Sequence, residues 1–487
     1  MTKSIAIIGG GIAGLSAGVY AQMNGFRSSI YERNDYAGGL CTSWDRKDYR
    51  FDGCIHWLTG TDPSSGYYKL WKEIGCVQDK EFYYYDYFTK VRDRNGRIVT
   101  FYNDPDRLEE ELLSHYPEDH DMIRKIRLSI RTLMKTEIPV DIHVKDLFKL
   151  PRIIREFYRF RMSPETFAAR FRNPGFRETF TSAFEWHGMS LVFNLWAVSL
   201  MASRNGGYPI GGSSGLIRSV VERYESLGGK IHYGAPVSKI LARDGRAEGI
   251  LLENGEEIRA DYVLSAADGH RTIYDWLEGK YTNDRINRLY RTLKPFPPLF
   301  FVSLGVQADY SGEPYTMTFL LKKPFSIGPD EIHRMSYRNH FFDPTLAPRG
   351  KSILLVMNET NYDYWESLYR DRTAYEAEKK RIAGCVIDGL AEVFPALPGQ
   401  IEVMDVATPM TFVRYSGNWR GSYEGWLLNS KTMLIQFPQK LPGLSNFFMA
   451  GHWISSGGGL PSGLITGRKA IKMICKKEKL SFKSFSE

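Results

Sequence analysis

The strongest constraint on the fold of this chain is a glycine pattern near its start, Gly9-x-Gly11-x-x-Gly14. A short apolar run precedes the pattern, a segment of small residues follows it, and a second apolar run comes next. The predicted strand, helix and strand span Ile5–Ile8, Ile12–Asn24 and Ser28–Glu32. A glycine pattern between a strand and a helix is typical of a βαβ unit that binds a dinucleotide.

Each residue of the pattern has a physical role in such a unit. Gly9 permits the tight turn, Gly11 lets the backbone approach a pyrophosphate, and Gly14 lets helix and strand pack closely. Glu32 ends the second strand about 20 residues later, where an acid accepts hydrogen bonds from a ribose and disfavours a 2′-phosphate. The pattern alone leaves NAD and FAD open, and a glycine-rich turn without a nucleotide is the structural alternative.

Later motifs resemble those of the amine oxidase and phytoene desaturase superfamily of flavoproteins. Gly38-Gly39 resembles its second FAD motif, and the stretch Phe51–Trp57 resembles one that lies beside the isoalloxazine ring. Phe448–Trp453, followed by Gly457–Gly463, resembles the last FAD motif. The helix after Pro461 would direct its N-terminus at the ring and stabilise the negative charge of reduced flavin.

The middle of the chain carries further matches to this superfamily. Gly206–Ser213 resembles its glycine-rich turn before a helix, Ala235–Val237 the backbone that lies against adenine, and Val263–Asp268 a closing strand. Thr411–Ser422 resembles the bacterial desaturase-like branch, whereas Ser455-Ser456 stands where desaturases tend to carry a proline. The nearest resemblance is to phytoene desaturases, carotenoid isomerases and retinol saturases.

The resemblance implies an α/β fold: a discontinuous Rossmann-type FAD-binding domain with an interleaved α+β substrate domain and a helical insert. The expected FAD-binding domain comprises residues 1–66, 205–275 and 440–487. The expected substrate domain comprises residues 67–204 and 276–439, including a helical insert at about 105–204. The cofactor would be FAD, bound non-covalently, although Cys54, His56 and His452 could reach the ring by position.

The residues expected to contact the cofactor come from all three parts of the first domain. They are Gly9, Gly11, Ile12, Ala13, Gly14, Glu32, Arg33, Gly39, Leu40, His56, Val237, Gly451, Gly459 and Leu460.

Three residues are candidates for moving a proton near the flavin. His56 has a suitable pKa class, Glu185 lies beside His187 and could form a relay with it, and Tyr208 is a candidate neighbour of the ring. Hydrogen bonding to the flavin, satisfied structural contacts and core packing are the respective alternatives. Tyr415, Trp419 and Trp453 are further candidate ring neighbours.

The resemblance implies an FAD-dependent oxidoreductase that acts on carbon–carbon bonds of a long apolar polyene or lipid by desaturation, saturation or isomerisation. Two alternatives stay open: a flavin amine or amino-acid oxidase, and a non-catalytic lipid-binding protein of the GTPase dissociation inhibitor fold. A second dinucleotide motif is absent from the sequence, which leaves the electron acceptor unknown.

The composition of the chain limits which partners and which cellular location the sequence predicts. The 487 residues carry a net charge of +8 and include 14% aromatic residues, which suit a pocket for an apolar ligand. The five cysteines form no C-x-x-C, which gives no indication of a zinc site or redox pair and fits a reducing cytoplasm. Nucleic-acid signatures are absent, and after the glycine-rich N-terminus no stretch approaches the roughly 20 apolar residues of a membrane span.

A basic, aromatic segment in the helical insert has the composition of a peripheral membrane contact. Its cations are Lys145, Lys149, Arg152, Arg155, Arg159, Arg161, Arg170, Arg172 and Arg177, and phenylalanines such as Phe148 lie between them. A basic amphipathic helix can lie on the inner, anionic membrane surface, where an enzyme could draw an apolar substrate. A solvated helical face that covers the substrate domain is the alternative.

Overall fold

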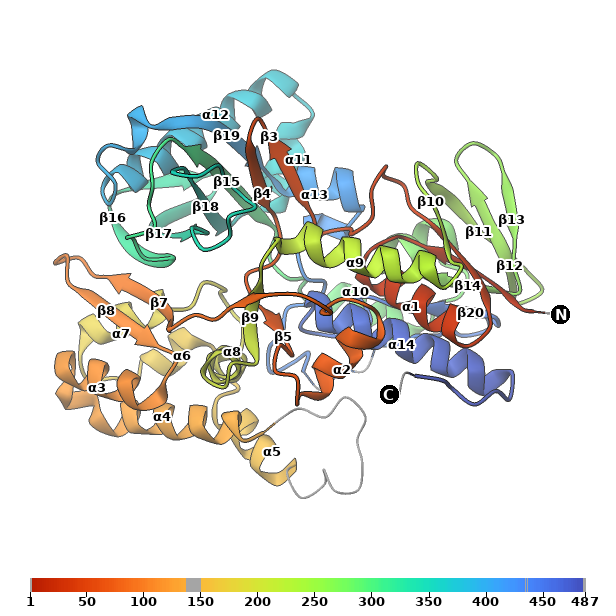
Figure 1. The fold of residues 1–487 in the computed structure, drawn as a ribbon, viewed down its shortest axis with the longest axis horizontal. Helices are drawn as coiled ribbons and strands as arrows, with labels where there is room; N and C mark the ends of the chain where they lie inside the picture. Colours follow the sequence, from red (N-terminus) through yellow and green to blue (C-terminus); the bar gives the residue numbers. More distant parts are fainter. Residues whose placement is uncertain (1, 137–149, 434, 436, 485–487) are drawn as a thin grey trace.

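A computed structural model describes residues 2–136, 150–433, 435 and 437–484. A parallel five-stranded sheet forms the part that begins with the glycine pattern, on the right of Figure 1. In spatial order its strands are β10 (Lys230–His232), β2 (Arg27–Tyr31), β1 (Ser4–Ile8), β14 (Tyr262–Ser265) and β20 (Phe447–Met449). These strands come from the beginning, the middle and the end of the chain, so the sheet closes only when distant segments meet.

Three helices pack against this sheet: α1 (Ile12–Met23), α9 (Gly212–Ser226) and α14 (Gly459–Lys477). Helices α1 and α14 are in close contact, because Gly463 and Gly467 of α14 have no side chain between them and the backbone of α1. A Cβ atom at Gly467 would lie 2.6 Å from the carbonyl oxygen of Ala13. The predicted βαβ unit is confirmed as β1, α1 and β2, and the C-terminal helix packs along α1.

A hairpin sheet and short strands flank the nucleotide-type sheet. They are β11 (Val237–Arg243), β12 (Arg246–Leu252), β13 (Glu257–Arg259), β3 (Ser43–Arg46), β4 (Tyr49–Asp52), β5 (Leu58–Thr59), β6 (Phe82–Tyr83) and β9 (Gly206–Pro209). The sequence predicts a turn at Gly206–Gly212, but residues 206–209 form β9, which pairs with both β5 and β6. Pairing partners more than 100 residues away override the local turn preference of the glycines.

A seven-stranded mixed sheet builds the second region, at the upper left of Figure 1. Its order is β19 (Ile401–Ala407), β15 (Leu299–Val306), β18 (Ser352–Glu359), β17 (Asp330–Asn339), β16 (Thr316–Ile327), β7 (Tyr87–Arg92) and β8 (Ile98–Tyr102). Its cover includes α11 (Tyr362–Tyr369) and α12 (Arg372–Ala391), which share an apolar core with it. Strand β15 is buried along its whole length, as expected of a central strand.

Helices below the seven-stranded sheet form a third region with its own phenylalanine-rich core. They are α3 (Pro105–His115), α4 (His120–Met134), α5 (Leu150–Arg159), α6 (Pro164–Ala168), α7 (Pro174–Ser182) and α8 (Leu191–Ala202). The remaining α-helices of the described residues are α2 (Gly66–Glu73), α10 (Asp284–Thr292) and α13 (Pro409–Ser416). The expected mixture of a parallel sheet, a second sheet and a helical insert is present.

Lys145, Phe148 and Lys149 of the basic segment lie outside the described residues.

Candidate functional site: a cavity at the edge of the parallel sheet

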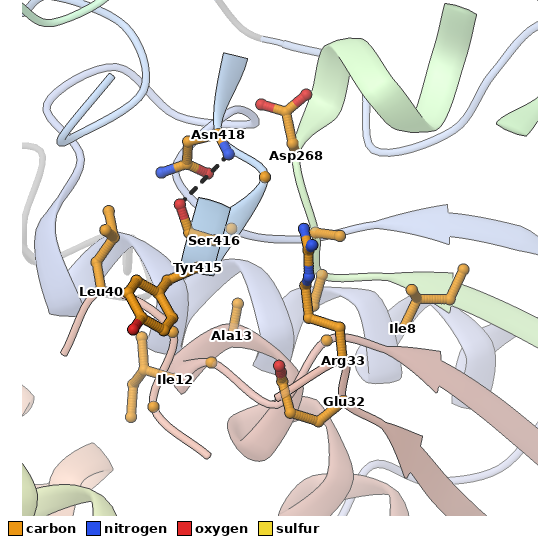
Figure 2. A pocket seen from close by; sticks show the side chains of 18 of the residues that line it. Ile8, Ile12, Ala13, Glu32, Arg33, Leu40, Asp268, Tyr415, Ser416 and Asn418 are labelled. Atoms are coloured by element: carbon orange, nitrogen blue, oxygen red, sulfur yellow. Dashed lines mark hydrogen bonds between the residues drawn. The ribbon is translucent and has the colours of Figure 1, made fainter. Parts of the chain in front are cut away.

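A cavity opens at the carboxyl edge of the parallel sheet, where ligands bind in open α/β folds. Its wall contains residues that follow β1, β2, β14 and β20, and Figure 2 shows several of them from close by. Much of the wall is bare backbone, supplied by Gly9, Gly11, Gly38, Gly39, Gly417, Gly451, Gly459 and Gly463. A wall without side chains lets a ligand approach main-chain N–H groups closely.

The turn between β1 and α1 requires its glycines. Gly9 has a φ of +95°, which L side chains rarely adopt, and its N–H donates to the Tyr31 carbonyl oxygen over 2.9 Å. A Cβ atom at Gly14 would collide with the carbonyl oxygen of Gly9. Gly9 and Gly14, whose roles were predicted from their spacing, therefore fix the turn that places the start of α1 at the cavity.

Glu32 is fixed at the end of β2 by hydrogen bonds. One carboxylate oxygen accepts from the N–H of Gly10 over 2.7 Å, and the other accepts from the backbone and side-chain N–H groups of Asn34, each over 2.9 Å. The side chain is only 5% exposed, yet it borders the cavity. Since a carboxylate accepts about four hydrogen bonds, Glu32 keeps capacity for a ribose hydroxyl.

A segment from the far part of the chain, residues 415–419, closes over the cavity. The Tyr415 carbonyl oxygen accepts from the side chain of Asn34 over 2.9 Å, and the Trp419 N–H donates to Asp268 over 2.8 Å. Figure 2 shows the hydrogen bond from the Asn418 N–H to Ser416 within this segment. Burial raises the pKa of Asp268 to about 7 against the lowering effect of its two backbone hydrogen bonds.

Two arginines line the same part of the cavity, Arg33 after β2 and Arg271 after β14. A Cβ atom at Gly417 would lie 3.4 Å from a terminal nitrogen of Arg33 and 3.5 Å from one of Arg271. Neither guanidinium has an ion-pair partner among the described residues. Two unpaired cations beside a glycine-rich wall suit an anionic ligand.

Two helix N-termini at the cavity provide the test of whether a flavin dinucleotide fits. Helix α1 starts after Gly11 and α14 after Gly458, and in the described part of the chain neither start has a side-chain cap or an acid in its first turn. Their first N–H groups are therefore available to external acceptors, as a pyrophosphate at α1 and an anionic ring at α14 require. With Glu32 placed for a ribose, the residues present fit FAD.

The cavity collects twelve of the fourteen residues that the sequence assigns to the cofactor. They are Gly9, Gly11, Ile12, Ala13, Glu32, Arg33, Gly39, Leu40, Val237, Gly451, Gly459 and Leu460. Gly14 lies behind the wall, where it acts through the turn, and His56 does not line the cavity. Cys54 and His452, the other positions considered for attachment, both line it.

None of the three candidate catalytic residues lines the cavity. Arg338 binds Glu185 and lies near His56, and the ring of Tyr208 packs against His340. Both ring nitrogens of His56 are buried without a partner among the described residues, and burial together with Arg338 keeps its pKa well below the usual range. Tyr208 donates to Asp343 over 3.1 Å, and Glu185 accepts from Arg338 over 2.7 Å. Their catalytic roles stay predictions.

The proposed relay and the proposed ring neighbours have other partners in the structure. His187 is half-exposed and contacts Glu359 at 3.1 Å, whereas Glu185 pairs with Arg338, so no shared hydrogen bond joins them among the described contacts. Of the aromatic candidates Tyr415 lines the cavity, whereas Trp419 and Trp453 pack against Trp426.

Tyr423 and Glu424, which no sequence pattern predicts, line the cavity together with Cys54 and His452. The hydroxyl of Tyr423 donates to the carbonyl oxygen of Gly53 over 2.7 Å and so joins two distant stretches of chain. Burial raises the pKa of Glu424 to about 7. No local pattern marks these residues, because their position depends on contacts with residues more than 25 positions away.

Solved structures with this architecture define the class of fold. The chain superimposes on putrescine oxidase with a TM-score of 0.64 and 14% identity, covering 98% of this chain and 99% of the other. Cyclohexylamine oxidase from Brevibacterium oxydans gives a TM-score of 0.61 at 14% identity, with 98% and 100% covered. At these identities the likeness shows the fold alone.

The family follows from sequence. The family model described as "Flavin containing amine oxidoreductase" matches residues 12–472, nearly the whole chain, and the protein belongs to this family. The predicted superfamily, fold class, FAD cofactor and oxidoreductase class are confirmed.

Curated relatives cover most of the chain at low identity. Prolycopene isomerase of Arabidopsis thaliana is 23% identical over 93% of this chain and 79% of its own. Phytoene desaturase (lycopene-forming) of a Paracoccus strain is 22% identical over 97% of both chains. All-trans-retinol 13,14-reductase of Danio rerio is 24% identical over 86% of this chain and 77% of its own. In the described residues, no helix combines the length and apolarity needed to cross a membrane.

Proposed function

We propose that the protein is an FAD-dependent oxidoreductase that acts on carbon–carbon bonds of a long apolar polyene or lipid, by desaturation, saturation or isomerisation. The observation that carries the cofactor part is the cavity itself, which joins Glu32, two uncapped helix starts and two unpaired arginines from separate parts of the chain. The relatives are named for prolycopene, phytoene and retinol, and these names support the proposed substrate class.

The chain's own residues would divide the work along the cavity. Glu32 would hold a ribose, the start of α1 with Arg33 and Arg271 would neutralise the pyrophosphate, and α14 would face the flavin ring. FAD, once bound, supplies hydride transfer at its N5 atom. His56, Glu185 and Tyr208 remain proposed members of the catalytic region, and we keep the predicted division into an FAD-binding part and a substrate part.

Two measurements test this function. Purified protein, or apoprotein reconstituted with FAD, should show the absorbance maxima of bound flavin, and denaturation should release the flavin without a covalent link. For a desaturase, anaerobic mixing with a panel of polyenes, retinol, fatty acids and amines should bleach the flavin only with an apolar, non-amine compound. For a saturase, the same panel is run against pre-reduced protein and scored by reoxidation. An isomerase changes the flavin redox state in neither assay and is scored by isomerisation of the compound.

The alternatives give different outcomes. Bleaching by amines alone would replace the proposal with amine oxidation, the activity for which the two structural neighbours are named. A colourless protein that cannot be reconstituted would favour the non-catalytic lipid-binding alternative.

We also propose peripheral contact with an anionic membrane through helix α5. Ile154 and Tyr158 are 61% and 70% exposed and lie four residues apart on one face, flanked by the exposed Arg155 and Arg159. Exposed apolar side chains beside cations suit an interface with acidic headgroups. Co-sedimentation with vesicles of anionic lipid should fall about 10-fold in an I154S/Y158S double variant. Equal binding to purely zwitterionic vesicles, or no change in the variant, would count against this contact.

A further inference from the structure

Glu424 lies in a tight turn that the rest of the molecule holds in place. The turn follows Trp419–Gly421, a short 3₁₀ helix. The carbonyl oxygen of Gly425 accepts from the Phe296 N–H over 2.6 Å and from the Ser422 hydroxyl over 2.9 Å. With the hydrogen bond from Tyr423 to Gly53 on the other side, the backbone of Glu424 is fixed from both directions.

This turn packs directly on the segment that leads into α14. A Cβ atom at Gly458 would collide with the Cβ and carbonyl oxygen of Glu424, and one at Gly425 would lie 2.5 Å from the carbonyl oxygen of His452. Because no side chain separates the two segments, Glu424 belongs to the same end of the cavity as Gly459 and Leu460. This is the end at which α14 would face the flavin ring.

Unlike Glu32 and Asp268, the other buried carboxylates of the wall, Glu424 has no hydrogen-bond or ion-pair partner among the described residues. Its side chain forms no hydrogen bond and no ion pair with the described residues, whereas Glu32 and Asp268 accept N–H donors. Burial is the cause that raises its pKa to about 7. An unpartnered carboxyl group in a cavity, with a pKa near neutrality, is suited to accept or donate a proton.

The groups next to Glu424 carry no positive charge that would balance a carboxylate there. Burial raises the pKa of Tyr423 well above its usual range, and Cys41 and burial do the same for Cys54, so both are neutral at pH 7. Burial lowers the pKa of His452 to about 4, so this ring is neutral as well. Asp52 lies behind Cys54 and accepts hydrogen bonds from Ser213. Glu424 is therefore the carboxyl group that lines this end.

We propose that Glu424 is the residue that exchanges a proton with the substrate at the ring end of the cavity, an inference that rests on the proposed function. In desaturation, two C–H bonds break and one C=C bond forms. One hydrogen leaves with its electron pair as a hydride to FAD, the oxidant, and the other leaves as a proton to the carboxylate of Glu424. In saturation, reduced flavin supplies the hydride and the protonated Glu424 supplies the proton.

The test measures the flavin midpoint potential against pH in FAD-loaded protein, without any substrate. Reduction places a negative charge on the ring, which raises the pKa of a nearby carboxyl group, so reduction takes up an additional proton. Between pH 7 and 9 the potential of the wild type should fall about twice as steeply as expected for one proton per two electrons. Glu424→Gln should show the one-proton slope, and Glu424→Asp should restore part of the steep range.

The possible results distinguish a failure of the role of Glu424 from a failure of the proposed function. Wild-type protein that binds no FAD overturns the proposed function. Wild-type protein that binds FAD but shows the one-proton slope overturns the role of Glu424 alone, and this result needs no variant to fold. A steep slope that persists in E424Q assigns the proton to another group, such as Asp268, and also overturns the role. Glu225→Gln, at an exposed position of α9, is the matched control and should keep the wild-type slope.

A chemical readout follows once a compound from the panel bleaches the flavin. The rate of bleaching by that compound should rise with pH through a single ionisation near 7 in the wild type. In E424Q the rate should fall at least about 100-fold and lose this pH dependence, because general acid–base catalysis contributes at least that much. An unchanged pH profile in E424Q contradicts the proposal.

Discussion

The two ends of the cavity differ in how their buried polar groups are partnered. At the end formed by β1, β2 and α1, Glu32 accepts three N–H donors, and Asp268 nearby accepts two. At the end formed by Gly53–Cys54, the Tyr423–Glu424 turn and the start of α14, Glu424 has no partner among the described residues. The buried ring nitrogens of His56, in the adjoining region, also lack partners there.

On the proposed function, this difference separates cofactor binding from proton exchange. Satisfied polar groups hold one geometry, which suits the recognition of a constant ligand such as a dinucleotide. Unsatisfied buried groups cost stability, and a fold keeps them where their titration or their contact with a ligand is used. The predictions below test the two ends in turn.

The largest effect is expected at the binding end from Gly14→Ala. The added Cβ would meet the Gly9 carbonyl oxygen, and two backbone segments cannot both move without opening the turn. We expect loss of bound FAD and a decrease of about 3 kcal/mol in the free energy of unfolding, measured by urea denaturation. Gly384→Ala in α12, where a Cβ meets nothing within 4 Å, should be neutral or stabilising. Wild-type flavin content in G14A would show that the turn is not required.

Glu32→Ala tests the satisfied carboxylate itself. The variant leaves the Gly10 N–H without its acceptor and removes the ribose contact, so FAD binding should weaken by about 1.5–3 kcal/mol, measured by titration of apoprotein. This corresponds to about 10- to 100-fold. The exposed Glu225→Ala serves as the control. Flavin content that survives dialysis unchanged would remove Glu32 from the binding site.

The pH dependence of the free energy of unfolding tests the end of the cavity that contains Glu424. The pKa of Glu424 is raised from 4.5 to about 7 in the fold, so the unfolded chain loses this proton first as pH rises. Its contribution to stability is therefore present below about pH 4.5 and is lost as the pH rises to about 7. Between pH 5 and 8 the free energy of unfolding of wild-type apoprotein should fall by about 2 kcal/mol relative to Glu424→Gln. Parallel pH curves for the two proteins would contradict the raised pKa.

Tyr423→Phe gives the smallest effect and sharpens the comparison. The substitution removes one hydroxyl that donates to Gly53 while it keeps the ring, so stability should fall by only about 1 kcal/mol. Because Tyr423 anchors the turn, the visible spectrum of bound FAD should shift, whereas FAD affinity should stay close to that of the wild type. A large loss of affinity would mean that both ends contribute to binding.

Much of the binding end could be predicted from the sequence because its determinants are local. The turn from Gly9 to Gly14 needs residues without Cβ atoms, and the apolar runs on either side have the lengths of a strand and a helix. The predicted strand Ile5–Ile8 and helix Ile12–Asn24 correspond to β1 and α1 within one residue. The sequence predicts that this last helix begins after Pro461, whereas α14 begins at Gly459, and Gly457 and Gly458, both at positive φ, complete the turn before it.

The surroundings of Glu424 and of the candidate catalytic residues could not be predicted in the same way. The glycines of 206–209 suggested a turn, but pairing with β5 and β6 makes them a strand. Glu185 and His187 are neighbours in sequence, yet their side chains find separate partners, Arg338 and Glu359. Glu424 carries no motif, and its place depends on contacts with Gly53, Phe296 and Gly458.

The sequence by itself determined the dinucleotide turn, the acid at Glu32 and the family, because backbone conformation at glycines and the period of apolar residues are set over a few positions. Only the tertiary structure decided which polar groups are buried together and which lack partners. Burial and pairing depend on segments that are hundreds of residues apart, and they set the pKa of Asp268 and Glu424. The dinucleotide turn of the cofactor site is therefore local in origin, whereas the rest of the cavity and the proposed proton-exchanging group arise from assembly of the whole chain.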